Sequence, residues 1–130
     1  MTQENKELLL KDLCARLPYG VKCKYYDCCE GDYDEGTICG FERQVFIQID
    51  GVCIHIEEVK PYLFPLSSMT KEQKKEFDQL IELELKAISD EIDPVQSTAF
   101  EVDFYNKYHY DWRGLIPMGL ANDATGLNIY

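Results

Sequence analysis

The sequence has no long run of apolar residues. Every hydrophobic stretch is much shorter than the roughly 18 residues that a membrane-spanning helix requires, so a transmembrane protein is not expected. The first 17 residues also lack the basic start, the continuous apolar segment and the small-residue cleavage site of a secretory signal. Together these absences predict a soluble protein of the cytoplasm.

Basic residues are few. Thirteen lysines and arginines stand against 24 aspartates and glutamates, and the formal net charge is −11. Such a charge repels phosphate backbones and anionic membrane surfaces, which argues against direct binding of nucleic acid or of a membrane. It leaves open a basic protein partner, and also an acidic mimic of nucleic acid that binds a DNA- or RNA-binding protein. An acidic surface can also serve solubility alone.

Internal repeats, low-complexity tracts and linkers are missing as well. A chain of 130 residues with 45% hydrophobic and 12% aromatic residues has the composition of a globular domain. At this length a chain buries roughly two thirds of its unfolded surface, which is enough to fold without metals or disulfides. We therefore expect one domain over residues 1–130, with six cysteines that the cytoplasm keeps reduced.

Apolar periodicity predicts an N-terminal helix. Leu9 and Leu13 recur at helical spacing, and the pattern continues over residues 4–17. Pro18 ends this helix, and Gly20 supplies a flexible turn into the first strand.

Residues 21–57 predict antiparallel strands, because apolar and polar residues alternate there. The acidic segment 30–36, with a glycine at each end of its acidic run, predicts a loop. Asp50 and Gly51 are a strong hairpin signal, since both central residues of a type I′ turn need positive φ. About four short strands in so few residues favour a small curved antiparallel sheet or an SH3-like barrel within an α+β fold, because curling reduces exposed edges.

Two prolines follow the strands. Pro61 and Pro65 cannot donate to a central ladder, so residues 58–68 are expected to leave the sheet. Thr70, with a glutamine three residues later, forms a capping box that predicts a helix over residues 71–90.

The last forty residues predict one more helix and a tail. The boundary Asp93-Pro94 precedes a helix over residues 98–109, and the tail over residues 110–130 is rich in glycine and expected to be irregular. Four apolar residues are expected to anchor this tail to the domain, namely Trp112, Leu115, Ile116 and Leu120.

Four blocks carry a resemblance. They are LPYGVK at residues 17–22, IEEVKPYL at residues 56–63, PLSSMT at residues 65–70 and YDWRGLI at residues 110–116. With these blocks the chain resembles small uncharacterised proteins of gut Bacteroidales and their bacteriophages. The resemblance touches most of the chain and implies an accessory or mobile-element protein that acts inside a bacterial cell. It implies no activity and transfers no functional residue.

The candidate metal ligands are Cys53 and His55, which share one face of a predicted strand with Glu57. The spacing of the cysteines is unfavourable, because no CxxC pair is present and structural zinc sites usually have one. Packing of these residues is therefore the preferred interpretation, and no cofactor is predicted.

Enzymatic activity has weak support in the sequence. Nucleophilic catalysis needs a cysteine or serine beside a histidine, and His55 and His109 are the only histidines. Neither stands in a recognisable signature. A small metal- or cysteine-dependent enzyme that uses Cys53 and His55 remains an alternative, and a cleft that joined them to His109 would favour it.

Aromatic residues and arginine supply the remaining candidate, a protein-binding surface. These residue types dominate interface hot spots because they bury a large area at a modest cost in entropy. The predicted binding residues are Tyr62, Phe64, Tyr108, Tyr110 and Arg113. Protein–protein interaction is accordingly the leading functional hypothesis.

Overall fold

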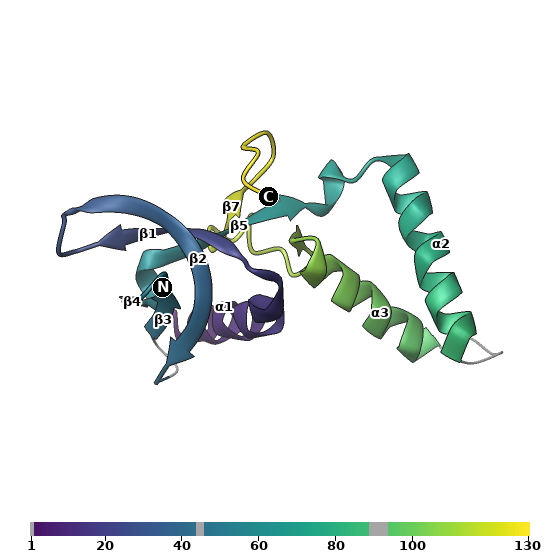
Figure 1. The fold of residues 1–130 in the computed structure, drawn as a ribbon, viewed down its shortest axis with the longest axis horizontal. Coiled ribbons are helices and arrows are strands. Elements are labelled where there is room, and N and C mark those ends of the chain that lie inside the picture. Colours follow the sequence, from purple (N-terminus) through teal and green to yellow (C-terminus); the bar gives the residue numbers. More distant parts are fainter. Residues whose placement is uncertain (1, 44–45, 89–93) are drawn as a thin grey trace.

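A computed structural model describes residues 2–43, 46–88 and 94–130, and it shows an α+β fold. An N-terminal helix is followed by a mixed sheet and then by further helices (Figure 1). The α-helices are α1 (Gln3–Arg16), α2 (Lys71–Ile88) and α3 (Pro94–Lys107). The strands are β1 (Lys22–Asp27), β2 (Asp32–Glu42), β3 (Phe46–Ile49), β4 (Val52–His55), β5 (Val59–Pro65), β6 (Tyr110–Asp111) and β7 (Asn122–Asp123). Short 3-10 turns lie at Leu17–Tyr19, Ile56–Glu58 and Leu66–Ser68.

The sheet has the strand order β4-β3-β2-β1-β5-β6, and β7 also pairs with β5. The first five strands are antiparallel neighbours, whereas β6 and β7 both run parallel to β5. Over the described residues the sheet does not close, so the SH3-like barrel is not confirmed. The expected curvature is visible in the long, bowed β2 (Figure 1).

The acidic segment 30–36 is mostly strand, and its prediction as a loop was wrong. β2 begins at Asp32, and Asp34 pairs with Tyr25 of β1. Only the hairpin tip turns, where Gly31 has a φ of 71°. A long-range ladder with β1 thus overrides the weak strand propensity of aspartate and glycine.

β5 lies inside the sheet, so the predicted exit at residues 58–68 was also wrong. The Phe64 N–H donates to the His109 carbonyl, while the Leu63 carbonyl accepts from Ala124 N–H. Neighbouring residues of a strand direct their backbone groups to opposite edges. The backbone groups of Pro61 therefore point to the same edge of β5 as those of Leu63, away from β1. The missing N–H of Pro61 thus removes no hydrogen bond between β1 and β5.

Three local predictions were confirmed, two of them at turns and one at the start of a helix. Asp50 and Gly51 both have positive φ, at 46° and 87°, as a type I′ hairpin requires. Gly20 has a φ of 68° after α1. Thr70 N–H donates to Gln73 Oε1 at 2.9 Å and Gln73 N–H donates to Thr70 Oγ1 at 3.1 Å, which is the predicted capping box.

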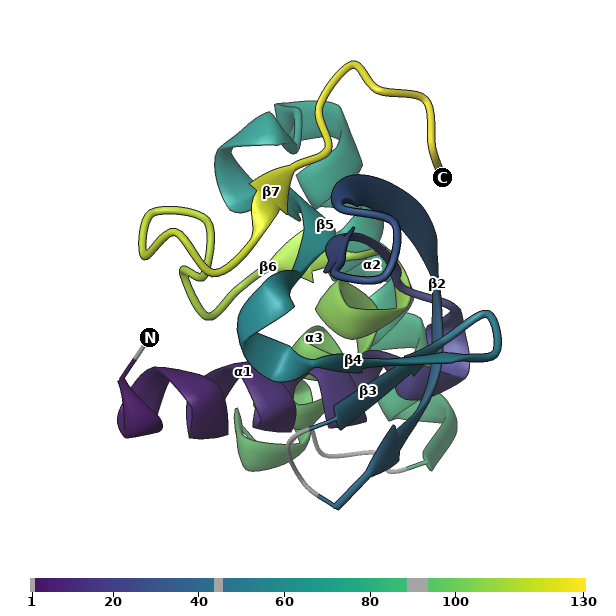
Figure 2. The ribbon, with the colours of Figure 1, turned by 90° about the vertical axis from the view of Figure 1, so that its left-hand side faces the viewer.

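The main core lies between α1 and the sheet, with α1 along the lower side of the strands (Figure 2). Leu9 and Leu13 of α1 are buried against strand residues such as Ile47 and Val59. Leu115 and Leu120 join this core and the half-buried Ile116 packs against it, so the prediction that the tail is anchored was confirmed for these three residues. The tail is less irregular than predicted, since it contributes β6 and β7.

The helices α2 and α3 form a hairpin that projects away from the sheet, called the helical arm below (Figure 1). Its own small core has Phe77 and Ile81 of α2 packed against Phe104 of α3. The third helix starts at Pro94, four residues earlier than predicted, and residues 89 and 90 of the predicted second helix lie outside the described residues. No helix in the described part of the chain is long and apolar enough to cross a membrane.

Candidate binding sites

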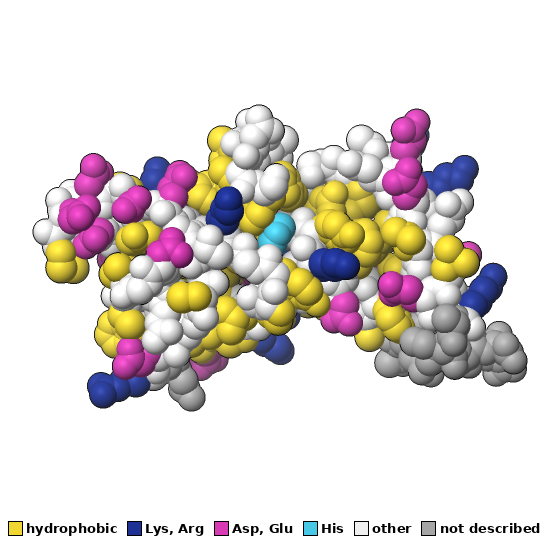
Figure 3. Space-filling model, in the orientation of Figure 1, with side chains coloured by type: hydrophobic (Ala, Val, Ile, Leu, Met, Phe, Trp, Pro, Cys, Tyr) yellow, Lys and Arg dark blue, Asp and Glu magenta, His cyan; other side chains and the backbone are white. Residues whose placement is uncertain are grey.

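The inner side of the helical arm carries an apolar groove, called the arm groove below. It consists of two adjoining hollows of about 350 and 240 Å³ that share Leu80, Phe104 and Tyr108. Leu80 is 50% exposed, and Leu83, one turn further along α2, is 65% exposed. Hydrophobic side chains gather on this part of the surface, over the start of α2 and the end of α3 (Figure 3).

Acidic side chains border the arm groove. Glu76, Glu84 and Asp103 line its two hollows, against one lysine, Lys107. The groove therefore combines exposed apolar residues with a net negative rim.

A second hollow, the aromatic hollow, lies where the arm, β5 and the C-terminal tail meet. Its volume is about 510 Å³. The lining residues are Phe64, Ser68, Gln73, Lys107, Tyr108, His109, Tyr110, Thr125, Gly126 and Tyr130. It joins three elements that are far apart in the sequence, and it shares four residues with the arm groove, namely Gln73, Lys107, Tyr108 and Tyr110.

His109 forms part of the wall of the aromatic hollow. Its side chain is 9% exposed, its φ is 64°, and its buried Nδ1 has no hydrogen-bond partner among the described residues. Burial and the nearby Arg16 charge lower the pKa of His109 to about 4, because both disfavour the imidazolium form. The imidazole is therefore neutral at pH 7.

Tyr130 covers His109 and ties the tail to the sheet. The two rings stack with centroids 3.8 Å apart and an interplanar angle of 14°. The Tyr130 hydroxyl accepts from Lys22 N–H and donates to the Tyr62 carbonyl, both at 2.8 Å. It thereby satisfies backbone groups of β1 and β5 that do not pair with each other.

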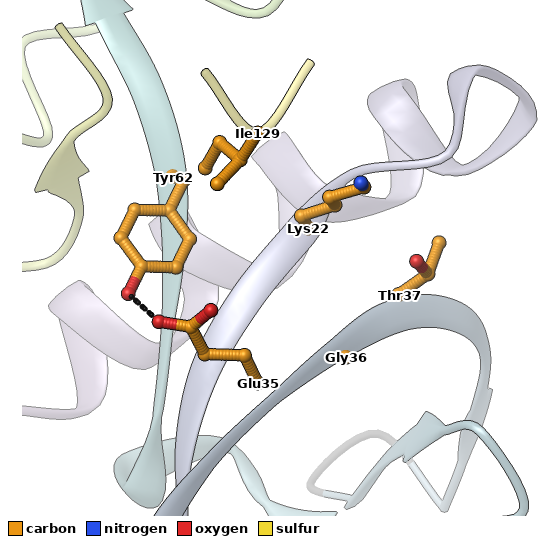
Figure 4. Close-up of a pocket in the computed structure, with 6 residues that line it drawn as sticks. All are labelled: Lys22, Glu35, Gly36, Thr37, Tyr62 and Ile129. Atoms are coloured by element: carbon orange, nitrogen blue, oxygen red, sulfur yellow. Dashed lines mark hydrogen bonds between the residues drawn. The ribbon is translucent and has the colours of Figure 1, made fainter. Parts of the chain in front are cut away.

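The structure separates the five predicted binding residues. Phe64, Tyr108 and Tyr110 line the aromatic hollow together. Tyr62 is buried, and its hydroxyl donates to Glu35 Oε1 at 2.9 Å beside a different, smaller hollow (Figure 4). Burial, and then this hydrogen bond to Glu35, raise the pKa of Tyr62 to about 12.

Arg113 belongs to a buried charge cluster instead. Its Nε donates to Asp12 Oδ1 at 3.0 Å, and its guanidinium lies 4.0 Å from the centre of the Trp112 ring. Asp12 also accepts from Arg16 Nε at 2.8 Å, and Arg16 Nη2 donates to the Tyr110 carbonyl at 2.6 Å. Arg113 thus stabilises the junction of α1 with the segment that follows α3.

Cys53 and His55, the candidate metal ligands, both lie on the edge strand β4. Within the described ranges, no group of three or more His, Cys, Asp or Glu side chains could hold a metal. Cys53 Sγ donates to Glu42 Oε2 at 3.1 Å, and His55 Nδ1 accepts from Glu57 N–H. The bond to Glu42 raises the pKa of the Cys53 thiol, which disfavours the thiolate that a metal or a nucleophile requires.

Neither Cys53 nor His55 lines the aromatic hollow that contains His109, so this hollow is not the joining cleft that would favour the enzyme hypothesis. Cys23 and Cys29 have raised thiol pKa values as well, the first through burial and the second through the neighbouring Cys28. The thiols of these described cysteines are therefore protonated at neutral pH.

Acidic residues concentrate at the opposite end of the molecule. The exposed side chains of Glu30, Asp32 and Asp34 and the half-buried Asp27 surround the tip of the β1–β2 hairpin. Figure 3 shows acidic side chains clustered at that end.

Several residues of these sites were not predicted from the sequence. Lys107 and Tyr130 were not predicted, and His109 was considered only as a partner of a nucleophile. Leu80 and Leu83 belong to a broad apolar stripe of the predicted second helix, which is wider than the face that Phe77 and Ile81 bury, so both leucines are exposed. Comparison of the chain with protein-family models, curated proteins and solved structures found no match.

Proposed function

We propose that the protein acts by protein–protein interaction in the bacterial cytoplasm and that its arm groove binds a basic amphipathic helix of the partner. The exposure of Leu80, which lines both hollows of the groove, carries this proposal, and Leu83, one turn further along α2, is exposed as well. Large apolar side chains that gather on a surface are typical of interaction sites. Helix-in-groove recognition uses such apolar anchors at helical spacing.

The negative charge around the arm groove favours a basic partner. The rim residues Glu76, Glu84 and Asp103 outnumber Lys107, and the whole chain has a net charge of −11. Complementary potentials raise the association rate and suppress wrong partners. A helix with apolar anchors flanked by lysine or arginine fits both features of the groove.

The test is affinity capture from a Bacteroidales lysate with matched variants. Leu80→Glu places a charge in the groove, whereas Leu127→Glu changes an equally exposed leucine in the tail. Both positions are 50% exposed, so we expect each variant to keep its stability within about 0.5 kcal/mol. A specific partner should be retained by the wild type and by Leu127→Glu and lost by Leu80→Glu.

Hydrogen exchange of the resulting complex locates the contact. We expect protection on α2 and α3 and a binding segment in the partner that is basic and helical. Affinity should fall with added salt, because charge complementarity is screened. Equal capture by both variants, or protection on another face alone, would show that the arm groove is not the interface.

A further inference from the structure

The aromatic hollow has an unusual charge for this protein. Its ten lining residues include one lysine and no acidic side chain, although the chain has 24 acidic residues and a net charge of −11. None of the ion pairs among the described residues involves Lys107, whose Nζ lies 5.6 Å from the centre of the Tyr108 ring. The hollow thus offers a cation and no acidic side chain in its own lining, while Asp103 and Glu84 line the neighbouring hollow of the arm groove that Lys107 also lines.

The walls of the hollow are aromatic. Phe64 lies between Tyr110 and Tyr130, with ring centroids 6.1 and 5.8 Å away and both pairs tilted. A volume of about 510 Å³ falls in the range of small-molecule sites, which are mostly apolar with a few polar groups that fix orientation. Here Lys107 and the side-chain amide of Gln73 are polar groups of that kind.

His109 has two features that lower the stability of the fold and that packing does not explain. An unpaired buried polar atom typically costs about 1–3 kcal/mol, and a left-handed backbone at a residue other than glycine adds to this cost. Both features occur at His109, within the wall of the hollow. Unpaired buried polar groups and strained backbone conformations are common at functional sites, because they lower the stability of the fold and persist where function requires them.

We propose that the aromatic hollow binds a small aromatic carboxylate, a planar ring with one carboxylate group. The ring would pack against Phe64 and Tyr110, and the carboxylate would bind Lys107. One lysine matches one carboxylate, whereas phosphate groups are usually met by several donors from arginine forks or backbone amides. This site adjoins the arm groove and shares Lys107 with it, but Leu80, which lines both hollows of the groove, does not line the aromatic hollow.

Phenylacetate is a suitable probe, and its binding can be followed by titration of ¹⁵N-labelled protein in NMR spectra. We expect saturable shifts of backbone amides around the hollow and a Kd of about 1 mM, as is usual for a fragment of this size. Two matched ligands test the two recognition elements. Phenylacetamide lacks the charge and cyclohexylacetate lacks the aromatic ring, and each should bind at least about fivefold more weakly.

Variants test the residues. Lys107→Met removes the charge and keeps an extended side chain, and we expect it to weaken phenylacetate binding about tenfold. Lys75→Met, at an exposed lysine of α2 outside the hollow, should bind as the wild type does. Phe64→Leu should also weaken binding.

Three results would overturn the proposal. They are the absence of saturable shifts at about ten times the expected Kd, equal binding of phenylacetate and phenylacetamide, and equal losses in Lys107→Met and Lys75→Met. The ligand comparison uses the wild-type protein, so it decides the question even if a variant fails to fold. Loss of the arm-groove interaction in Leu80→Glu would leave this result unchanged.

Discussion

The buried charge cluster of α1 gives the most specific prediction. Asp12 and Arg16 are fully buried, and Asp12 accepts hydrogen bonds from Arg16 Nε at 2.8 Å and from Arg113 Nε at 3.0 Å. Asp12→Asn preserves the shape of the side chain and removes its charge. Arg16 would then be a buried cation whose other contacts are the carbonyls of Tyr105 and Tyr110.

Removing one partner of a buried ion pair typically costs about 3–5 kcal/mol, because the remaining charge is uncompensated. Domains of this kind are stable by about 5–15 kcal/mol, so Asp12→Asn should remove a large share of the free energy of unfolding. Arg113→Met should cost less, about 1–2 kcal/mol, since Asp12 then keeps Arg16 as its partner. The Arg113 side chain is also 15% exposed, so water already compensates part of its charge.

Urea unfolding followed by far-ultraviolet circular dichroism measures both losses. This signal is preferable to fluorescence, because Arg113 lies over the Trp112 ring and its substitution alters the emission directly. The reasoning would be refuted if Asp12→Asn lost less than about 1 kcal/mol, the size of an ordinary surface or packing change. It would also be refuted if Arg113→Met proved the more damaging substitution.

Three further predictions concern other parts of the molecule. Because the folded pKa of His109 is lowered to about 4 from its usual 6.5, its contribution to stability is complete above pH 6.5 and is lost as the pH falls toward 4. The wild type should lose about 1–2 kcal/mol more than His109→Asn over this range in urea unfolding, and parallel curves would contradict the lowered pKa. Gly36→Ala should destabilise by about 1–3 kcal/mol, because the new Cβ would meet buried Ile49 Cγ2 at 2.5 Å. Gly40→Ala is its control and should cost less, since its Cβ meets only the end of a flexible glutamine at 2.7 Å. Protein purified without an affinity tag should contain no stoichiometric zinc, and chelator should leave its melting temperature unchanged; zinc that is lost in Cys53→Ser would revive the metal hypothesis.

Elements that depend only on residues adjacent in the sequence could be predicted from the sequence. The Asp50-Gly51 hairpin, the Thr70 cap and the end of the first helix near Pro18 all follow from local backbone preferences, and the structure has each of them. The alternation of apolar and polar residues over 21–57 also agrees with the burial of strand residues such as Cys23 and Ile47. Val52 is an apolar residue of this pattern that is exposed, because it lies on the edge strand β4.

Pairing between distant segments decided the rest of the fold. Asp34 is in a strand because β1 lies beside it, and Pro61 is tolerated in β5 because its nitrogen faces away from β1. The sequence marks both segments as breaks in the sheet. Whether each segment forms a strand depends on the strand that lies beside it and on the edge to which its backbone groups point. Local propensity encodes neither of these.

The sequence by itself determined the class of the fold, the acidic charge and the kinds of residue available for binding. The tertiary structure decided which of these residues meet. Phe64, His109 and Tyr130 line the aromatic hollow together because β5, the turn after α3 and the C-terminal tail converge. Arg113 instead pairs with Asp12, which lies 101 positions earlier in the chain. Side-chain chemistry is a local property, but a site requires proximity, and in this protein proximity arises from contacts between segments that the sequence keeps far apart.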